Sequence, residues 1–179
     1  MIEYDVDYYY NLLRIHADTA RMICKIRWDF IEENINEKMI QVLDYGCGVG
    51  FMKAFAPKYA LVDTFDIMPV PQTGLRTDSY DLVMLYDVLE HIPDFTEIHN
   101  ILKMASFVVL SVPMKPGNIP WKAYKHFKPG EHLHYFTHSL LVHIFSTLGF
   151  KLVKRGIPEC PPREFVYTYL FKREEKSND

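Results

Sequence analysis

The 179-residue chain contains few cysteines, no long apolar run and little net charge, and each shortage excludes a class of protein. Its three cysteines, Cys24, Cys47 and Cys160, are odd in number and far apart, which argues against a disulfide framework and a paired-cysteine metal site. No apolar run approaches the roughly 20 residues that span a bilayer, and the amino terminus lacks a signal-peptide pattern. The formal charge of -3 provides no overall field for nucleic acid or an anionic membrane. We therefore expect a soluble, cytoplasmic protein with reduced thiols.

What the chain does contain is apolar and aromatic side chains. Hydrophobic residues make up 49% of the sequence and aromatic residues 15%, which is too many for a disordered chain. At this length, one domain is the default. We predict a single domain over residues 1–179, with an amino-terminal helical segment at 1–37 that acts as a lid, an α/β core at 38–172 and a charged tail at 173–179.

Short apolar runs alternate with helical stretches from Ile40 onward. The runs read IQVLDY, LVDTFD, YDLVMLYD and FVVLSVP. Continuous Val, Leu and Ile runs split by helices are typical of parallel strands covered on both faces, so the sequence predicts an α/β fold with a mostly parallel sheet. Before Ile40 the apolar residues recur at helical spacing, with Asp18 or Thr19 as the candidate cap.

The carboxyl-terminal third reads as a loop, a helix and two strands. Residues 114–136 are aperiodic and rich in aromatic side chains, and a loop of this length inside a small domain is usually functional. Thr137 is a plausible cap for a helix that stops at Gly149. The runs FKLVKR and REFVYTYLFK flank the proline-rich GIPECPP, which indicates two antiparallel strands joined by a turn.

The stretch VLDYGCGVGF, residues 42–51, places three glycines directly after a predicted strand. In an open α/β sheet the ligand lies beyond the carboxyl ends of the strands, and a glycine-rich first turn lets backbone amides approach it. A dinucleotide fingerprint needs a third small residue at position 51, where Phe51 stands instead. The spacing therefore argues against NAD.

The same stretch resembles the first motif of the S-adenosylmethionine-dependent methyltransferases with a Rossmann-like fold. The resemblance implies S-adenosylmethionine as cofactor and S-adenosylhomocysteine as product. It also implies that Asp66, in TFDI, binds the ribose and that Ile67 lies on the adenine. The residues implied to hold the amino acid end of the cofactor are Asp44, Gly46, Cys47, Gly48 and Gly50.

Two further stretches carry the resemblance, which spans roughly residues 40–171. SYDLVMLYDVLEHIPDF resembles the strand motif of the family that runs into the site, which implies Asp87 and Val88 as cofactor contacts and brings Glu90 and His91 to the site. GEHLHYFTHSLLVHIFSTLGFKLV resembles the carboxyl-terminal part of small-molecule members.

The chain departs from the family in one interval. Asp66 and Asp81 are close in sequence, whereas the family normally fits a helix, a third strand and an adenine-contacting loop between them. We therefore predict a reduced sheet, in which the third strand and its preceding helix are shortened or missing, with an antiparallel carboxyl-terminal strand. Adenine recognition then depends on the short 67–80 segment.

The candidate catalytic residues are histidines, because imidazole titrates near neutral pH and suits a general base. Three of them, His134, His132 and His91, fall in the long loop or after the strand that enters the site. Candidate substrate contacts are Trp121, Tyr124, Tyr135 and Tyr9. The alternative interpretation is a packed aromatic loop with satisfied histidines, and the sequence leaves both open.

A metal site is not predicted. The histidines at positions 126, 132, 134, 138 and 143 crowd one stretch, but Glu131 is the only acidic residue near them in sequence. Metal ligation needs three or four convergent ligands.

The sequence thus predicts methyl transfer to a small hydroxylated or amino acceptor such as a sugar, a nucleotide or another metabolite. A nucleic-acid methyltransferase is the first alternative, although only WKAYKHFK combines basic and aromatic residues. A non-catalytic binding module of the same fold is the second. We expect no membrane partner, and an exposed edge of the reduced sheet would permit a homodimer.

Overall fold

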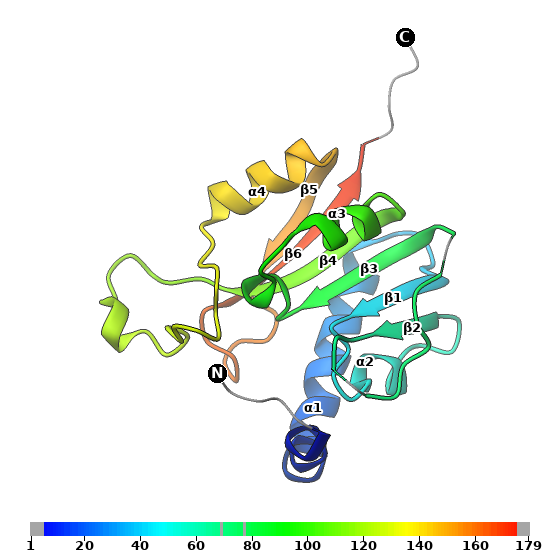
Figure 1. Cartoon of the computed structure of the whole chain (residues 1–179). Helices are drawn as coiled ribbons and strands as arrows, with labels where there is room; N and C mark the ends of the chain where they lie inside the picture. The colour runs from blue at the N-terminus through cyan, green and yellow to red at the C-terminus, as the bar shows by residue number, and fades with distance from the viewer. Residues whose placement is uncertain (1–5, 69, 77, 175–179) are drawn as a thin grey trace.

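The computed structural model describes residues 6–68, 70–76 and 78–174, with side chains from residue 18 onward. Six strands form one sheet, and helices lie on both of its faces (Figure 1). The elements in chain order are α1 (Val6–Asn34), β1 (Gln41–Tyr45), α2 (Phe51–Ala54), β2 (Leu61–Phe65), β3 (Tyr80–Tyr86), η1 (Leu89–His91), α3 (Thr96–Leu102), β4 (Ala105–Pro113), η2 (Trp121–Ala123), α4 (His138–Thr147), β5 (Phe150–Gly156) and β6 (Val166–Arg173).

The strands follow the order β2-β1-β3-β4-β6-β5. The first four strands are parallel to one another, whereas β6 is antiparallel to both β4 and β5. The register sets Asp44 of β1 opposite Thr64 of β2 and Met84 of β3, so the carboxyl ends of these three strands meet at one edge. The mostly parallel sheet with an antiparallel carboxyl-terminal strand is therefore confirmed.

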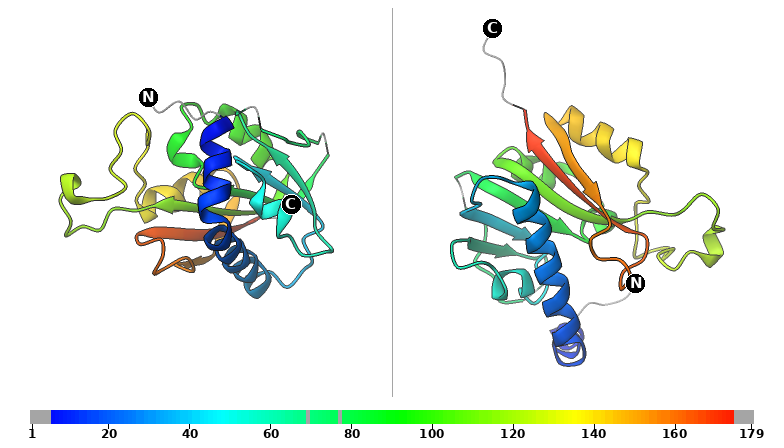
Figure 2. Two further views of the ribbon diagram at one scale, coloured as in Figure 1. Left: turned by 90° about the horizontal axis from the view of Figure 1, so that it is seen from below. Right: turned by 180° about the vertical axis from the view of Figure 1, so that it is seen from behind.

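Each face of the sheet is covered by its own helices. Cys24, Trp28 and Ile31 of α1 pack with Met52 of α2 over one face. On the other face, α3 packs against β4, and α4 packs against β5 and β6, where the fully buried Phe145 stacks on Phe171 with ring centroids 4.2 Å apart. Figure 2 shows α1 crossing the rear of the sheet, on the side opposite α4. This three-layer packing explains why β3 and β4 read as continuous apolar runs.

The predicted reduction of the sheet is confirmed. The described residues between β2 and β3 form neither a helix nor a strand, and β2 is the edge strand. Thr73 binds that edge: its hydroxyl accepts from Thr64 N at 2.8 Å, and its N–H donates to Thr64 O at 3.2 Å. The segment between β2 and β3 thus forms hydrogen bonds with backbone groups of β2 that a further strand would otherwise bind.

One cap predicted from the sequence is right and the other is wrong. The Thr137 side chain accepts a hydrogen bond from Leu140 N at 3.2 Å, and Gly149 ends the α4 region with a φ of 79°. Helix α1, by contrast, begins at Val6, so Asp18 and Thr19 lie inside it. The helical period continues upstream of both residues, and a capping residue type alone does not interrupt it.

The long 114–136 loop extends away from the sheet beside α4 (Figure 1). Within the described residues its only helical turn is η2. Across the described part of the chain, no helix combines the length and apolar character needed to cross a membrane.

Candidate functional site

The glycine turn connects β1 to α2 at the edge where the parallel strands end. Gly46, Gly48 and Gly50 all have positive φ, at 76°, 52° and 78°. A Cβ built on Gly46 would lie 2.4 Å from Val88 Cγ2, so this glycine lets the turn pack directly against the segment after β3. Two of the motifs found in the sequence are thereby in contact.

Asp66 links the glycine turn to the end of β2. Its Oδ2 accepts from Gly48 N at 2.8 Å, and its Oδ1 accepts from Met68 N at 2.9 Å. Its own N–H donates to Gln72 Oε1 at 2.8 Å. The carboxylate is buried, while the neighbouring Ile67 side chain is 84% exposed. The shortened segment thus holds Asp66 in place and leaves Ile67 on the surface.

Asp44 is a buried carboxyl group beneath the turn. Its side chain is 3% exposed, and its Oδ2 has no hydrogen-bond partner among the described residues. Burial raises the pKa of Asp44 to about 7, against the opposing effect of Arg27 and with a further increase from Asp66. Burial together with Asp44 and Asp66 also raises the pKa of Cys47, in the turn, to about 12, so that thiol is neutral.

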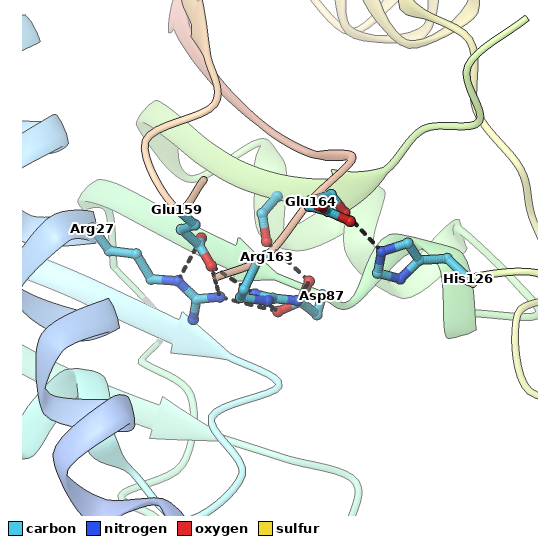
Figure 3. A network of polar contacts seen from close by, with 7 residues as sticks. Arg27, Asp87, His126, Glu159, Arg163 and Glu164 are labelled. Carbon is cyan, nitrogen blue, oxygen red and sulfur yellow. Dashed lines mark hydrogen bonds and ion pairs between the residues drawn. The ribbon is translucent and has the colours of Figure 1, made fainter. Parts of the chain in front are cut away.

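Asp87, which directly follows β3, is surrounded by two arginines (Figure 3). Arg163 donates to both of its oxygens at 2.8 Å, and Arg27 Nη2 donates to Oδ2 at 3.0 Å. The fully buried Glu159 binds the same two guanidinium groups, with Arg27 Nε at 2.9 Å and Arg163 Nη1 at 2.7 Å. Ser111 Oγ adds a hydrogen bond to Asp87 at 3.2 Å.

This four-residue ion-pair network joins three segments that are distant in sequence: α1, the end of β3 and the turn between β5 and β6. Burial by itself would raise the pKa of Asp87, but Arg163 and Arg27 outweigh it and hold that pKa well below its usual range. Asp87 also has a φ of 59°, a conformation that costs a non-glycine residue energy and persists only when its surroundings fix it.

A second polar cluster lies where η1 meets the long loop. Glu90 is 2% exposed, and its Oε2 has no partner among the described residues. His132 is 6% exposed, and its Nδ1 has none either. The rings of His91 and His132 meet edge to face with centroids 4.8 Å apart. His91 Nδ1 lies 2.9 Å from Glu131 O, so Nδ1 carries the N–H that donates to this carbonyl, and in the neutral ring Nε2 is the nitrogen with the lone pair.

The electrostatics of this cluster follow from its burial. Burial, with a contribution from the nearby Asp87, raises the pKa of Glu90 to about 8. Burial, with contributions from His91 and Lys128, lowers the pKa of His132 to about 4. The His132 imidazole is therefore neutral at pH 7.

The third candidate histidine is separate from this pair. His134 Nε2 lies 2.8 Å from Ile92 O, and its ring packs against Phe95 with centroids 5.0 Å apart. The bonded nitrogen is a donor to a carbonyl, so it has no lone pair with which to accept a proton. His134 fastens the loop to the segment after η1.

The aromatic residues of the long loop form their own cluster. Trp121 is exposed on one side and contacts Tyr135 edge to face at 5.1 Å. Tyr124 is buried, and its hydroxyl has no partner among the described residues. Tyr9 lies in α1, and its side chain is outside the described residues. The loop thus places an exposed indole, Trp121, above a buried phenol, Tyr124.

Two surface grooves lie away from these clusters. One, of about 580 Å³, runs between α1 and the end of α2, where Arg21 and Phe55 are among its lining residues. The other, of about 410 Å³, lies beside Lys58 and Asp63. Neither is lined by the glycines, Asp44, Asp66 or the histidine pair.

Sequence reasoning missed Arg27, Glu159 and Arg163. One signal was available for Arg27, because it lies on the same face of α1 as Cys24 and Ile31, where a charged side chain needs a buried partner. Glu159 and Arg163 lie in a proline-rich turn, and their spacing carries no such signal.

Comparison with known proteins identifies the family and the fold. The profile of the methyltransferase domain family matches residues 16–155. A search of curated protein sequences gave no match. The magnesium protoporphyrin IX methyltransferase of Synechocystis PCC 6803, solved with bound S-adenosylhomocysteine, is 21% identical, with a TM-score of 0.60 over 89% of this chain and 84% of that one.

Two structures with lower sequence identity share the fold. An S-adenosylmethionine-dependent methyltransferase from Clostridium acetobutylicum is 10% identical, with a TM-score of 0.64 over 94% of this chain and 98% of that one. The 16S rRNA methylase ArmA is 16% identical, with a TM-score of 0.55 over 93% and 91%. The family match covers most of the chain, and the fold agrees with it. The chain belongs to the methyltransferase domain family and has the Rossmann-like fold of its S-adenosylmethionine-dependent members.

Proposed function

We propose that this chain transfers a methyl group from S-adenosylmethionine to a hydroxyl or amino group of a small acceptor. The observation that carries the proposal is the buried, unpartnered oxygen of Asp44 beneath the glycine turn. A carboxylate left without a partner in a dry site is costly, and a bound cationic group removes that cost. The ammonium group of an amino acid is such a cation.

Asp66 and Ile67, which follow β2, suit the ribose and the adenine of the cofactor. Each Asp66 oxygen accepts one backbone N–H and keeps capacity for another donor, as two ribose hydroxyls require. The exposed Ile67 offers an apolar surface to an adenine ring. When bound, S-adenosylmethionine supplies a methyl group on a positively charged sulfur. The task of the protein is then to position the acceptor in line with it.

For the acceptor we propose the space between Val88, the cluster of Glu90, His91 and His132, and the long loop. The histidines have unprotonated nitrogens that suit the removal of a hydroxyl proton. Among the three candidates, His91 and His132 fit this role better than His134, because their rings meet beside the buried Glu90, whereas His134 is held separately at Ile92 O. The exposed Trp121 offers a flat apolar wall to the acceptor.

The alternative of a nucleic-acid substrate has less support. A 16S rRNA methylase shares the fold, but a shared fold does not identify the substrate of this chain. In WKAYKHFK, Lys125 pairs with Glu164 at 3.4 Å and Lys128 pairs with Glu131 at 2.7 Å. Because two of the three lysines in this segment already pair with acidic side chains, the segment is a poor phosphate-binding stripe.

Calorimetric titration with S-adenosylmethionine, S-adenosylhomocysteine and NAD tests the cofactor. We expect both sulfur ligands to bind and NAD not to bind. Asp44→Asn should weaken binding about 10- to 100-fold, the usual loss for a hydrogen bond to a charged group. Asp29→Asn, on the outer surface of α1, is the matched control and should bind normally. If neither sulfur ligand binds the wild-type protein, the non-catalytic binding module replaces this proposal.

Acceptor screening follows from a positive titration. S-adenosylhomocysteine production would be measured against panels of sugars, nucleotides, hydroxylated metabolites and short RNAs. Turnover with a small acceptor supports the proposal, whereas turnover only with RNA would move the chain to the alternative class.

A further inference from the structure

Three side chains at the junction of η1 and the long loop converge on one point. Glu90, His91 and His132 each offer a ligand atom, and these atoms all lie within 4.8 Å of one another. Atoms that converge so closely on a common centre suit a single coordinated ion. We propose that Glu90, His91 and His132 form a binding site for a divalent first-row transition-metal ion.

Two of the three side chains carry a buried polar atom that lacks a partner among the described residues. Oε2 of Glu90 and Nδ1 of His132 have no hydrogen-bond partner among the described residues, and both side chains are more than nine-tenths buried. Buried polar atoms in native proteins are nearly always satisfied, so two such atoms in side chains that converge on one centre indicate that something binds there. A cation satisfies a carboxylate oxygen and an imidazole lone pair together.

The third ligand is oriented by a contact of the kind that metal-binding histidines make. His91 Nδ1–H donates to Glu131 O at 2.9 Å, which leaves Nε2 free to bind the ion. Metal-ligating histidines commonly donate their other nitrogen to a carbonyl or carboxylate, which fixes the ring and its tautomer.

The backbone holds the two ligand-bearing segments together. Leu133 N and His134 N both donate to Glu90 O, at 2.7 and 3.2 Å. The side chain of His134 adds a contact to Ile92 O at 2.8 Å. The separation of the ligands is therefore set by the fold before any ion arrives, and His134 acts as a positioning residue.

The donor set selects the kind of ion. Two imidazoles and one carboxylate are a common set for Zn²⁺ and for other first-row divalent ions, with open coordination positions. Mg²⁺ and Ca²⁺ prefer oxygen ligands. Asp87 is nearby, but both of its oxygens are bound by arginine, so we exclude it from the ligand set.

The role of the ion rests on the proposed function, although its binding does not. An acceptor hydroxyl in an open position would lose its proton to solvent more readily, because a divalent ion lowers the pKa of a bound hydroxyl. The oxygen lone pair then forms the bond to the methyl carbon, while the carbon–sulfur bond breaks and its electron pair stays on sulfur. Glu90, His91 and His132 would thus act together as metal ligands instead of one histidine acting as a free base.

Co²⁺ titration of metal-stripped protein, followed by visible absorption, tests the site directly. We expect saturable binding of one equivalent, with visible bands that Zn²⁺ abolishes by displacement. Glu90→Gln and His132→Gln should each weaken Co²⁺ binding at least 10-fold. His143→Ala, an exposed histidine on α4, is the matched control and should bind like the wild type. Circular dichroism would establish that each variant is folded, and His91→Asn replaces any variant that is not.

Two outcomes overturn the proposal: no saturable Co²⁺ band in the wild-type protein, or unchanged binding in folded Glu90→Gln and His132→Gln. The same samples are titrated with S-adenosylmethionine to separate this inference from the proposed function. Cofactor binding without Co²⁺ binding would overturn the metal site alone. Co²⁺ binding without cofactor binding would overturn the proposed function and leave the metal site standing.

Discussion

Two carboxylates at neighbouring strand ends, the partly buried Asp87 and the buried Asp44, differ in how their charge is compensated. Asp87, after β3, receives hydrogen bonds from two arginines, and its pKa is held well below the usual range. Asp44, at the end of β1, has an oxygen without a partner, and burial raises its pKa to about 7. The charge of Asp87 is satisfied by the protein itself, so its role is to hold three segments together. The charge of Asp44 is left for a ligand.

The largest expected effect comes from breaking the ion pairs that hold Asp87. Arg27→Met removes a donor from both Asp87 and the fully buried Glu159. Removing one partner of a buried ion pair typically costs about 3–5 kcal/mol, and we expect a loss of this size in the free energy of unfolding, measured by urea denaturation. Arg76→Ala, which removes an exposed ion pair with Asp78, is the control and should change little. A loss below about 1 kcal/mol for Arg27→Met would show that the network is not structural.

Asp44 should show the opposite behaviour, with a defined dependence on pH. Its pKa is raised in the folded protein from an ordinary value of 3.8, so the folded state binds the proton more tightly than the unfolded state does. The resulting stability is fully present below about pH 4 and is lost as pH rises to about 7. At pH 8, Asp44→Asn should therefore stabilise the ligand-free protein by roughly 2–4 kcal/mol, and below pH 4 it should not.

Thermal or urea unfolding of wild type and Asp44→Asn across pH 4–8 measures this difference. Arg27 and Asp66 are the charged groups that act on Asp44, so Asp66→Asn should lower its pKa and reduce the pH dependence. Parallel stability curves for wild type and Asp44→Asn would mean that Asp44 already has a partner in solution.

The glycine turn offers a smaller effect that tests its contact with Val88. Gly46→Ala adds a Cβ at 2.4 Å from Val88 Cγ2 in a backbone with a φ of 76°. We expect a loss of roughly 1–3 kcal/mol in stability together with loss of cofactor binding. Gly50→Ala has a similar φ but meets nothing within 4 Å, so it should cost about 1 kcal/mol or less. The double variant Gly46→Ala with Val88→Ala should recover part of the stability, and no recovery would mean that φ alone is responsible.

How far the sequence predicts each region depends on how local its interactions are. The glycine turn and Asp66 are read from contiguous motifs, because neighbouring parallel strands bring their carboxyl ends together. The missing third strand is equally local, since the short interval after Asp66 leaves no room for it. These features are set by periodicity, turn chemistry and segment length.

The ion-pair network and the proposed metal site depend on contacts between residues that are far apart in the sequence. Arg27 and Glu159 are 132 positions apart, and Asp87 and Arg163 are 76 apart. His132 was recognised from the sequence as a candidate base, but Glu90 and His91 reach it only because the long loop is tied back to η1. Without those contacts the histidines show only Glu131 as a nearby acid, so the sequence argued against a metal. Spacing along the chain cannot reveal ligands that meet only through a loop.

The smallest expected effect concerns His134, which separates positioning from catalysis. His134→Ala removes the hydrogen bond to Ile92 O and should leave cofactor affinity unchanged. Losing one hydrogen bond that holds the loop costs about 1 kcal/mol, so turnover should fall roughly 5- to 10-fold. His134→Asn retains a donor and should restore part of the rate. If His134 were instead the general base, asparagine would not restore the rate, and the acidic limb of the rate against pH would disappear in both variants. Initial rates from pH 5 to 9 for the wild type and the two variants would therefore distinguish a residue that holds the loop from one that takes the proton.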